Sequence, residues 1–190
     1  MSSSRSKVSP LTLDQQRAEF ASAKFLAMPI AGTIAWAVVG AASLVLSTQI
    51  TALVLFAATG SIFYLGLLVA KITGEDLLGK TRPGNLFDRL FLLSIGMACL
   101  VYAIAIPFFL IEPTSLPLTV GILTGLMWLP FSGIIQHWVG YFHAAARTVL
   151  IVAVWYLFPE YRFLSVSLVI IVIYAVTISA LHRRRRVVGG

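Results

Sequence analysis

Long stretches of this chain offer almost nothing to water. The run from Phe25 to Leu46 contains no charged residue, and comparable apolar runs follow along most of the sequence. Hydrophobic residues make up 59% of the 190 residues and charged residues only 11%, against roughly a quarter charged in soluble domains. A soluble fold of this size could not cover its surface with polar side chains. The composition therefore predicts an integral membrane protein.

The apolar runs have the length of membrane-spanning helices. About 20 residues cross the hydrocarbon core as a helix, and a helix satisfies its backbone hydrogen bonds without water. We therefore predict an all-α bundle of six transmembrane helices. The six predicted spans cover approximately residues 25–46, 50–70, 90–111, 116–135, 139–158 and 164–181. A polar arm, 1–24, precedes this domain of 25–181, and a basic tail, 182–190, follows it. In the arm, Thr12 and Gln15 have the spacing of a helix-capping box.

The basic residues predict the orientation. Four of the 14 lysines and arginines lie in the N-terminal arm, four between residues 71 and 89, and four in the C-terminal tail. Cytoplasmic loops are enriched in these residues, so six spans with both termini in the cytoplasm place twelve of the 14 on one side. Because the net charge of +7 lies beside apolar runs, we expect anionic lipid headgroups rather than nucleic acid as its partner.

One charged residue lies well inside a predicted span. Arg147 is in the run 139–158, and a charge at the membrane centre costs about 2.5 to 3.5 kcal/mol on insertion scales. Gln136, Gly140 and His143 precede it at intervals of four, three and four, which predicts one polar helix face. Further candidate ligand-binding residues are His137 at the end of that face, and Thr124 and Trp128 on the preceding span. The short connection between the two spans makes them antiparallel neighbours, so the polar rows are expected to meet.

No acid falls within a predicted span, so nothing in the sequence neutralises Arg147. Two interpretations are open: the guanidinium binds an anion or a lipid headgroup, or it extends toward the headgroups and anchors its helix. Gly121 and Gly125 form a GxxxG pair, which predicts close helix packing. The single cysteine, Cys99, and three scattered histidines do not form a metal-ligand pattern, so neither metal nor cofactor is expected.

Three classes of function compete. The polar face favours a transporter or binding protein for a small anionic solute or lipid headgroup. The small size and the GxxxG pair favour an interaction or assembly protein without ligand chemistry, either as a homo-oligomer or with another membrane protein. An enzyme is the least favoured class, because no pair of titratable groups lies in the spans.

Two segments carry a family resemblance. The chain resembles a family of small bacterial polytopic membrane proteins of uncharacterised function. The resemblance lies in TGSIFYLGLLVAKITGEDLLGKTRPG (59–84) and GLMWLPF (125–131). The family pattern has a histidine where this chain has Met127 and a tyrosine where it has Phe131. The resemblance implies a location in the inner membrane of a bacterium and no particular activity.

Overall fold

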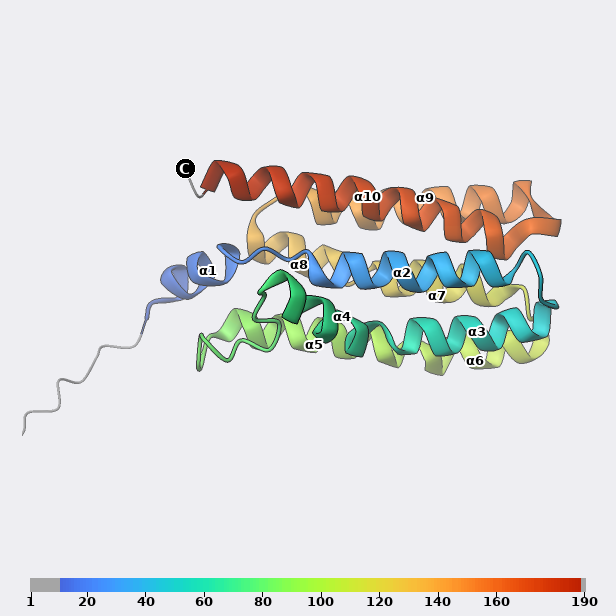
Figure 1. Ribbon diagram of the computed structural model, residues 1–190, viewed down its shortest axis with the longest axis horizontal. Coiled ribbons are helices and arrows are strands. Elements are labelled where there is room, and N and C mark those ends of the chain that lie inside the picture. The colour runs from blue at the N-terminus through green and yellow to red at the C-terminus, as the bar shows by residue number, and fades with distance from the viewer. Residues whose placement is uncertain (1–10, 189–190) are drawn as a thin grey trace, which may run out of the picture.

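The computed structural model describes residues 11–188, and this part of the chain is all-α. Figure 1 shows the helices running back and forth along one long axis. The helices are α1 (Leu13–Ala21), α2 (Ala27–Ala42), α3 (Thr48–Gly60), α4 (Ile62–Thr73), α5 (Leu86–Leu100), α6 (Tyr102–Ile111), α7 (Ser115–Gly125), α8 (Trp128–Ile135), α9 (Val139–Leu157) and α10 (Arg162–Val188), with a short 3-10 turn at Pro159–Tyr161.

Helix length and hydropathy identify a multi-pass membrane protein. Four stretches are long and apolar enough to cross a membrane: Leu86–Ile111, Ser115–Ile135, Val139–Leu157 and Pro159–Arg184. The pair α3 and α4 forms a fifth if it is counted as one span, bent by 48°. The remaining predicted span, 25–46, corresponds to α2, which has only 16 residues. The structure therefore shows four or five candidate spans where the sequence predicts six.

Local chemistry explains why α2 is shorter than its apolar run. Phe25 adopts a left-handed backbone conformation with φ of 57°, which a non-glycine residue rarely adopts and which ends helical geometry before α2 begins. The carboxylate of Glu75 then accepts hydrogen bonds from the backbone N–H groups of Leu26 and Ala27. At the other end, the Ser43 hydroxyl donates to the carbonyl of Gly40. Hydropathy marks where the chain is apolar, but these contacts decide where the helix begins and ends.

The helix is interrupted within three of the predicted spans, between α3 and α4, between α5 and α6, and between α7 and α8. Between α3 and α4, the hydroxyls of Thr59 and Ser61 donate to backbone carbonyls one turn earlier, on either side of Gly60, and such residues commonly accompany kinks. Between α7 and α8, Pro130 lacks the N–H that would bond to the Leu126 carbonyl, and the break lies there. At the C-terminus α10 continues to Val188, beyond the predicted end at residue 181, because arginine favours helix and no glycine or proline intervenes.

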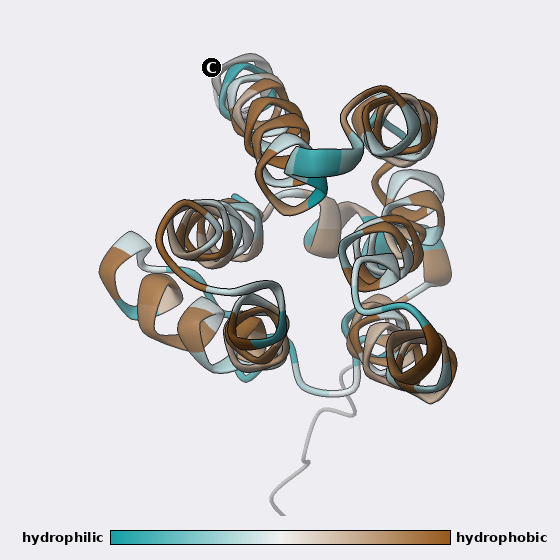
Figure 2. Ribbon diagram, turned by 90° about the vertical axis from the view of Figure 1, so that its right-hand side faces the viewer, coloured by the Kyte–Doolittle hydropathy of each residue, from teal (hydrophilic) through white to brown (hydrophobic). Residues whose placement is uncertain are grey.

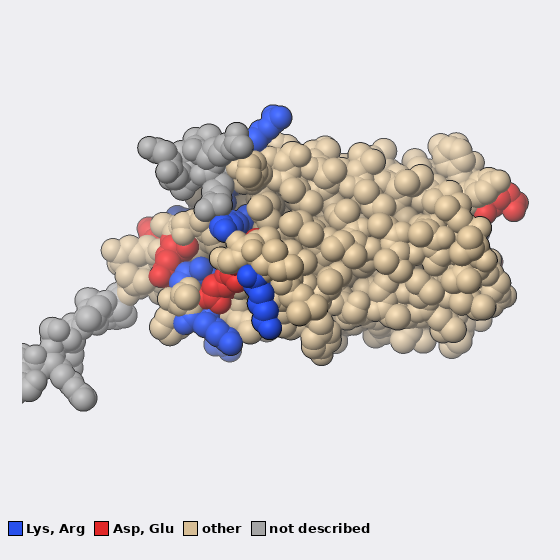
Figure 3. All heavy atoms as spheres, in the orientation of Figure 1, with Lys and Arg blue, Asp and Glu red and all other residues tan. Residues whose placement is uncertain are grey.

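The charged side chains gather at one end of the bundle. Figure 3 shows basic and acidic residues at the end that carries α1, the α4–α5 connection and the last turns of α10, while the long sides are free of charge on this face. Viewed along the axis, apolar residues lie on the outward faces of the helices as well as the inward ones (Figure 2). A bundle that is apolar on both sides is typical of helices surrounded by lipid.

Helix α1 begins with the predicted capping box. The Thr12 hydroxyl accepts from the Gln15 backbone N–H, and the Gln15 side chain accepts from the Thr12 N–H, which confirms that prediction. Phe20, at the end of α1, is 1% exposed and packs against the rings of Phe25 and Phe91. Helix α1 is therefore held against the charged end of the bundle by an aromatic contact.

The connection between α4 and α5 is ordered by its acids. The Asp76 carboxylate accepts hydrogen bonds of 2.6 Å from both the backbone N–H and the hydroxyl of Thr81. Burial alone would raise the pKa of Asp76, but these bonds, a bond from the Lys80 backbone and the charge of Arg82 lower it to about 2. Because this pKa lies below the ordinary 3.8, ionised Asp76 stabilises the connection above pH 4, and that contribution is lost as the pH falls toward 2.

Replacing Thr81 with valine removes the hydroxyl donor and should raise the pKa of Asp76 toward its ordinary value. The acid-induced loss of this contribution should then begin at a higher pH. Titration of the side-chain carboxyl by NMR measures the midpoint, with Lys80→Gln as a control that keeps the Thr81 donors. An unchanged midpoint in Thr81→Val would show that the hydroxyl does not lower this pKa.

Candidate functional site

Arg147 lies in the interior of the bundle. It is 1% exposed, and at 1.5 Å per residue it sits about 12 Å from the start of α9 and about 15 Å from its end. Helix α9 packs against α7 and α10 (Figure 1), and these two helices supply Gly121, Thr124 and Tyr174 as partners of Arg147. The side chain is enclosed between helices and hydrogen-bonded to them, which does not fit an arginine that extends along the bundle surface to anchor its helix.

Four polar groups surround the guanidinium. Nε donates to the Gly121 carbonyl at 2.6 Å, and one terminal nitrogen donates to the Tyr174 hydroxyl at 3.2 Å and lies 3.3 Å from Nε2 of His143. The other terminal nitrogen donates to the Thr124 hydroxyl at 3.1 Å. All four are neutral groups, and none of the chain's seven acids, all within the described residues, forms a salt bridge with Arg147. The positive charge is solvated by dipoles and has no counter-ion in the described chain.

Two glycines on α7 make room for this arrangement. A Cβ added to Gly125 would lie 2.8 Å from Cδ of Arg147, and one added to Gly121 would lie 3.0 Å from Cδ1 of Ile151. Side chains at these positions would therefore push α9 away from α7. The GxxxG pair faces the inside of this chain, where it admits the stem of Arg147.

The hydrogen bonds around His143 define its tautomer. The Thr177 hydroxyl donates to the Ile173 carbonyl, so its oxygen accepts from Nδ1 of His143 at 2.8 Å. With the proton on Nδ1, Nε2 is left with a lone pair that accepts from Arg147. The imidazole is also stacked on Trp128, with ring centroids 4.4 Å apart. His143 thus serves as a neutral acceptor that helps hold the guanidinium.

A cavity of about 80 Å³ adjoins this cluster. Thr124, Trp128 and Tyr174 line one side of it, and Thr59 and Tyr102, from α3 and α6, line another. The Tyr174 hydroxyl accepts from Arg147, and within the described residues its own proton has no hydrogen-bond acceptor. A phenol polarised by a guanidinium is a stronger donor than a free phenol. Tyr174 therefore brings to the lining of this cavity a side chain whose hydroxyl is a donor backed by a positive charge.

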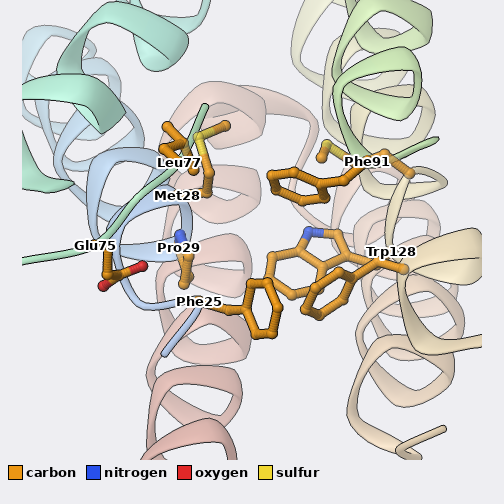
Figure 4. A pocket seen from close by; sticks show the side chains of 9 residues that line it. Phe25, Met28, Pro29, Glu75, Leu77, Phe91 and Trp128 are labelled. Atoms are coloured by element: carbon orange, nitrogen blue, oxygen red, sulfur yellow. The ribbon is translucent and has the colours of Figure 1, made fainter. Parts of the chain in front are cut away.

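A second, smaller cavity continues toward the charged end. It has a volume of about 20 Å³ and shares Met28, Met127 and Trp128 with the first. Figure 4 shows the rings of Phe25, Phe91 and Trp128 facing one another across it, with the Glu75 carboxylate at its edge. Apolar and aromatic side chains thus close the polar cavity from the charged end.

The structure brings together most of the predicted site residues. Arg147, His143, Thr124 and Trp128 meet at one cluster, and Gly140 allows α9 to approach α8. Gln136 is the exception: it caps α8 in a left-handed conformation with φ of 49° and lies before α9 begins. The prediction that Gln136 shares the helix face of Arg147 is therefore wrong, because the chain turns at that residue.

His137 also lies outside the cluster, in the turn between α8 and α9. Its Nδ1 accepts from the Val139 N–H, and its carbonyl accepts from the Ser132 hydroxyl. Two residues of the cluster, Tyr174 and Thr177, were not among the predicted site residues. Their spacing of three places them on one face of α10, which is the only sequence signal that could have pointed to them. Within residues 11–184, no group of three or more histidine, cysteine or acidic side chains has the arrangement of a metal site.

Comparison with curated proteins and with solved structures gave no significant match. A family model matches residues 12–184, which span α1 to the last turns of α10. This agrees with the resemblance to a family of uncharacterised function. The chain belongs to DUF7010, a family of unknown function.

Proposed function

We propose that this membrane protein binds a small anion in the cavity beside Tyr174 and Thr124, using the positive charge of Arg147. The observation that carries the proposal is a buried guanidinium without an acidic partner among the described residues, next to a cavity that presents an unused O–H donor. A bound anion would supply the missing counter-charge and accept the hydrogen bond of Tyr174.

Electrostatic attraction and hydrogen bonding favour an anion at this position. Holding an arginine at the membrane centre costs about 2.5 to 3.5 kcal/mol. An anion separated from the guanidinium by one hydroxyl group, roughly 6 Å, gains about 3 kcal/mol at an effective dielectric constant of 20. The hydrogen bond from Tyr174 adds about 1.5 to 3 kcal/mol because its acceptor is charged. These gains oppose the cost of taking the anion out of water, which is several kcal/mol for a buried ion.

The cavity size limits the ligand. A water molecule takes up about 30 Å³ in the liquid, so 80 Å³ accommodates two or three waters or one small anion. Drug-sized ligands occupy roughly 300 to 1,000 Å³. We therefore favour a halide or a small oxyanion over the complete headgroup of a phospholipid.

For topology, we propose six spans with both termini in the cytoplasm, in the inner membrane of a bacterium. The gathering of charged residues at the end that holds α1, the α4–α5 connection and the C-terminal turns supports this orientation, because cytoplasmic segments are enriched in lysine and arginine. The opposite end carries Glu112, Glu160 and Arg162. Helix α2 would be the short span, running parallel to the others in Figure 1.

The alternative, an assembly protein without ligand chemistry, has less support. Its main sequence argument was the pair Gly121 and Gly125, and these glycines face Ile151 and Arg147 of the same chain. They are therefore not available to a second copy or to another membrane protein.

Thermal unfolding of the purified protein tests the anion site. At constant ionic strength, replacing gluconate, which is too large for the cavity, by chloride, nitrate or phosphate should raise the Tm. A ligand at 100 times its Kd stabilises by about 2.7 kcal/mol, which corresponds to roughly 5 to 10 °C for a chain of this size. The increase should disappear in Arg147→Gln and shrink in Tyr174→Phe, and should persist in the control Arg162→Gln.

Native mass spectrometry of the same samples separates two sources of the anion. Retained phospholipid that is lost in Arg147→Gln would identify a lipid phosphate as the ligand. Equal Tm values in all salts, with no lipid lost in Arg147→Gln, would refute the anion site.

A further inference from the structure

A second polar site lies on the outside of the bundle, at its charged end. A groove of about 620 Å³ runs between the last turns of α10 and the turn that joins α8 to α9. Its polar lining residues are His137, Trp138, Ser179, Arg183 and Arg184, and Ala175 and Val176 are among the apolar residues that line it. None of the lining residues is acidic. The groove therefore combines a positive end with an apolar floor.

The two arginines differ in burial and in hydrogen bonding. Arg184 is partly buried and donates to the Ala21 carbonyl at 2.6 Å, so it ties α10 to the end of α1. Arg183 is exposed and forms no salt bridge or hydrogen bond with the other described residues. One arginine thus fixes the shape of the groove, and the other remains available for a ligand.

His137 and Trp138 supply N–H groups beside Arg183. Nδ1 of His137 accepts from the Val139 N–H at 3.3 Å, which leaves the proton on Nε2 as a donor. Burial, and then the charge of Arg184, lower the pKa of His137, so this neutral form is the one present at pH 7. Trp138 is 55% exposed, and tryptophan is enriched where membrane meets water.

The floor of the groove continues into a lipid-facing surface. Ala175 and Val176 are exposed, and so are Leu168 and Val172 further along α10. The small side chain of Ala175 leaves a depression there, in which an acyl chain could lie along the helix with its headgroup at Arg183. The acyl chain would thus contact apolar side chains, and the charged headgroup would contact Arg183.

A second groove provides a contrast. It has a volume of about 480 Å³ and lies beside α4, where Lys71 and Lys80 are accompanied by the carboxylates of Glu75 and Asp76. Acids among the basic residues cancel the attraction for an anionic headgroup. Of the two grooves, only the one at α10 combines basic residues with no acid.

We propose that the groove between α10 and the α8–α9 turn is a binding site for one anionic phospholipid, with its phosphate at Arg183 and His137 and an acyl chain over Ala175 and Val176. This site is independent of the cavity beside Arg147. It selects for net negative charge in the headgroup and requires an attached chain, so free phosphate does not occupy it.

Native mass spectrometry with defined lipids tests this site. The full chain, delipidated in detergent, is titrated with phosphatidylglycerol or with phosphatidylcholine of the same acyl chains. Wild type should prefer phosphatidylglycerol. A basic residue near an anionic surface contributes about 1 kcal/mol, so Arg183→Gln should weaken phosphatidylglycerol binding about fivefold. Lys80→Gln, which removes the same charge beside the mixed groove, should leave the binding unchanged.

The groove itself is tested by Ala175→Phe, which fills the floor at an exposed position and alters no charge. It should weaken phosphatidylglycerol binding as well, whereas millimolar inorganic phosphate should not compete in wild type. Equal effects of Arg183→Gln and Lys80→Gln, or unchanged binding in Ala175→Phe, would overturn the proposal. Arg147→Gln should retain this lipid, which separates the site from the anion cavity.

Discussion

Replacing Gly140 with alanine should destabilise the protein by about 3 kcal/mol, at the upper end of the usual cost of overpacking. An added Cβ would lie 2.8 Å from Cβ of Ser132 and closer still to the backbone carbonyl oxygen of Trp128. A carbonyl in a helix cannot rotate away, so α8 and α9 must separate. That separation would draw Trp128 away from His143 and loosen the cluster around Arg147.

Gly133→Ala is the matched control for this change. Its added Cβ would meet only the Tyr141 hydroxyl, at 3.7 Å, which is an ordinary contact. Because alanine favours helix over glycine by about 1 kcal/mol, this variant should be neutral or slightly more stable. Denaturant unfolding in detergent, followed by circular dichroism, measures both. Equal stability of the two variants would show that α8 and α9 do not approach as closely as described.

Replacing Arg82 with methionine should cost about 3 to 5 kcal/mol, the usual loss when one partner of a buried ion pair is removed. Arg82 and Asp88 form a two-pronged pair, with nitrogen–oxygen distances of 2.7 and 2.9 Å, and their side chains are only 12% and 10% exposed. Without Arg82, the Asp88 charge stays buried beside Gly79. The α4–α5 connection should then loosen, together with the cap that Glu75 forms on α2.

The double variant Arg82→Met/Asp88→Leu distinguishes charge from packing. It removes both charges, and replacing a buried pair by apolar residues is often nearly neutral, so most of the lost stability should return. Lys80→Met, at an exposed position of the same connection, should change the stability by less than about 0.5 kcal/mol. A double variant as unstable as Arg82→Met would show that packing, not the unpaired charge, dominates this contact.

The membrane fold was largely predictable, because lipid restricts an apolar chain to helices. The capping box at Thr12 was also predictable, because it depends only on residues three positions apart in the sequence. The positions where helices end or bend were not. The cap that Glu75 forms on α2 joins residues 48 or 49 positions apart. Phe25, whose backbone is left-handed, packs against the distant rings of Phe91 and Phe131. Local hydropathy does not describe such contacts.

Only the part of the candidate site that lies on α7, α8 and α9 was predictable. Helical spacing placed His143 and Arg147 together on α9, and the short α8–α9 connection brought Thr124 and Trp128 opposite them. Tyr174 and Thr177 come from α10, and no rule of spacing determines which face of a later helix packs against α9. Gln136 failed because a helix period applies only within a helix, and α9 begins three residues later.

Equilibrium binding of a radiolabelled small anion to the purified protein tests the central claim most directly. Chloride and phosphate should each be measured by scintillation proximity on wild type, Arg147→Gln and Tyr174→Phe, with folding checked by circular dichroism. The account predicts saturable binding of at least one of the two to wild type, none to folded Arg147→Gln, and weaker binding to Tyr174→Phe. Equal binding to wild type and Arg147→Gln, or no binding to either, would contradict it.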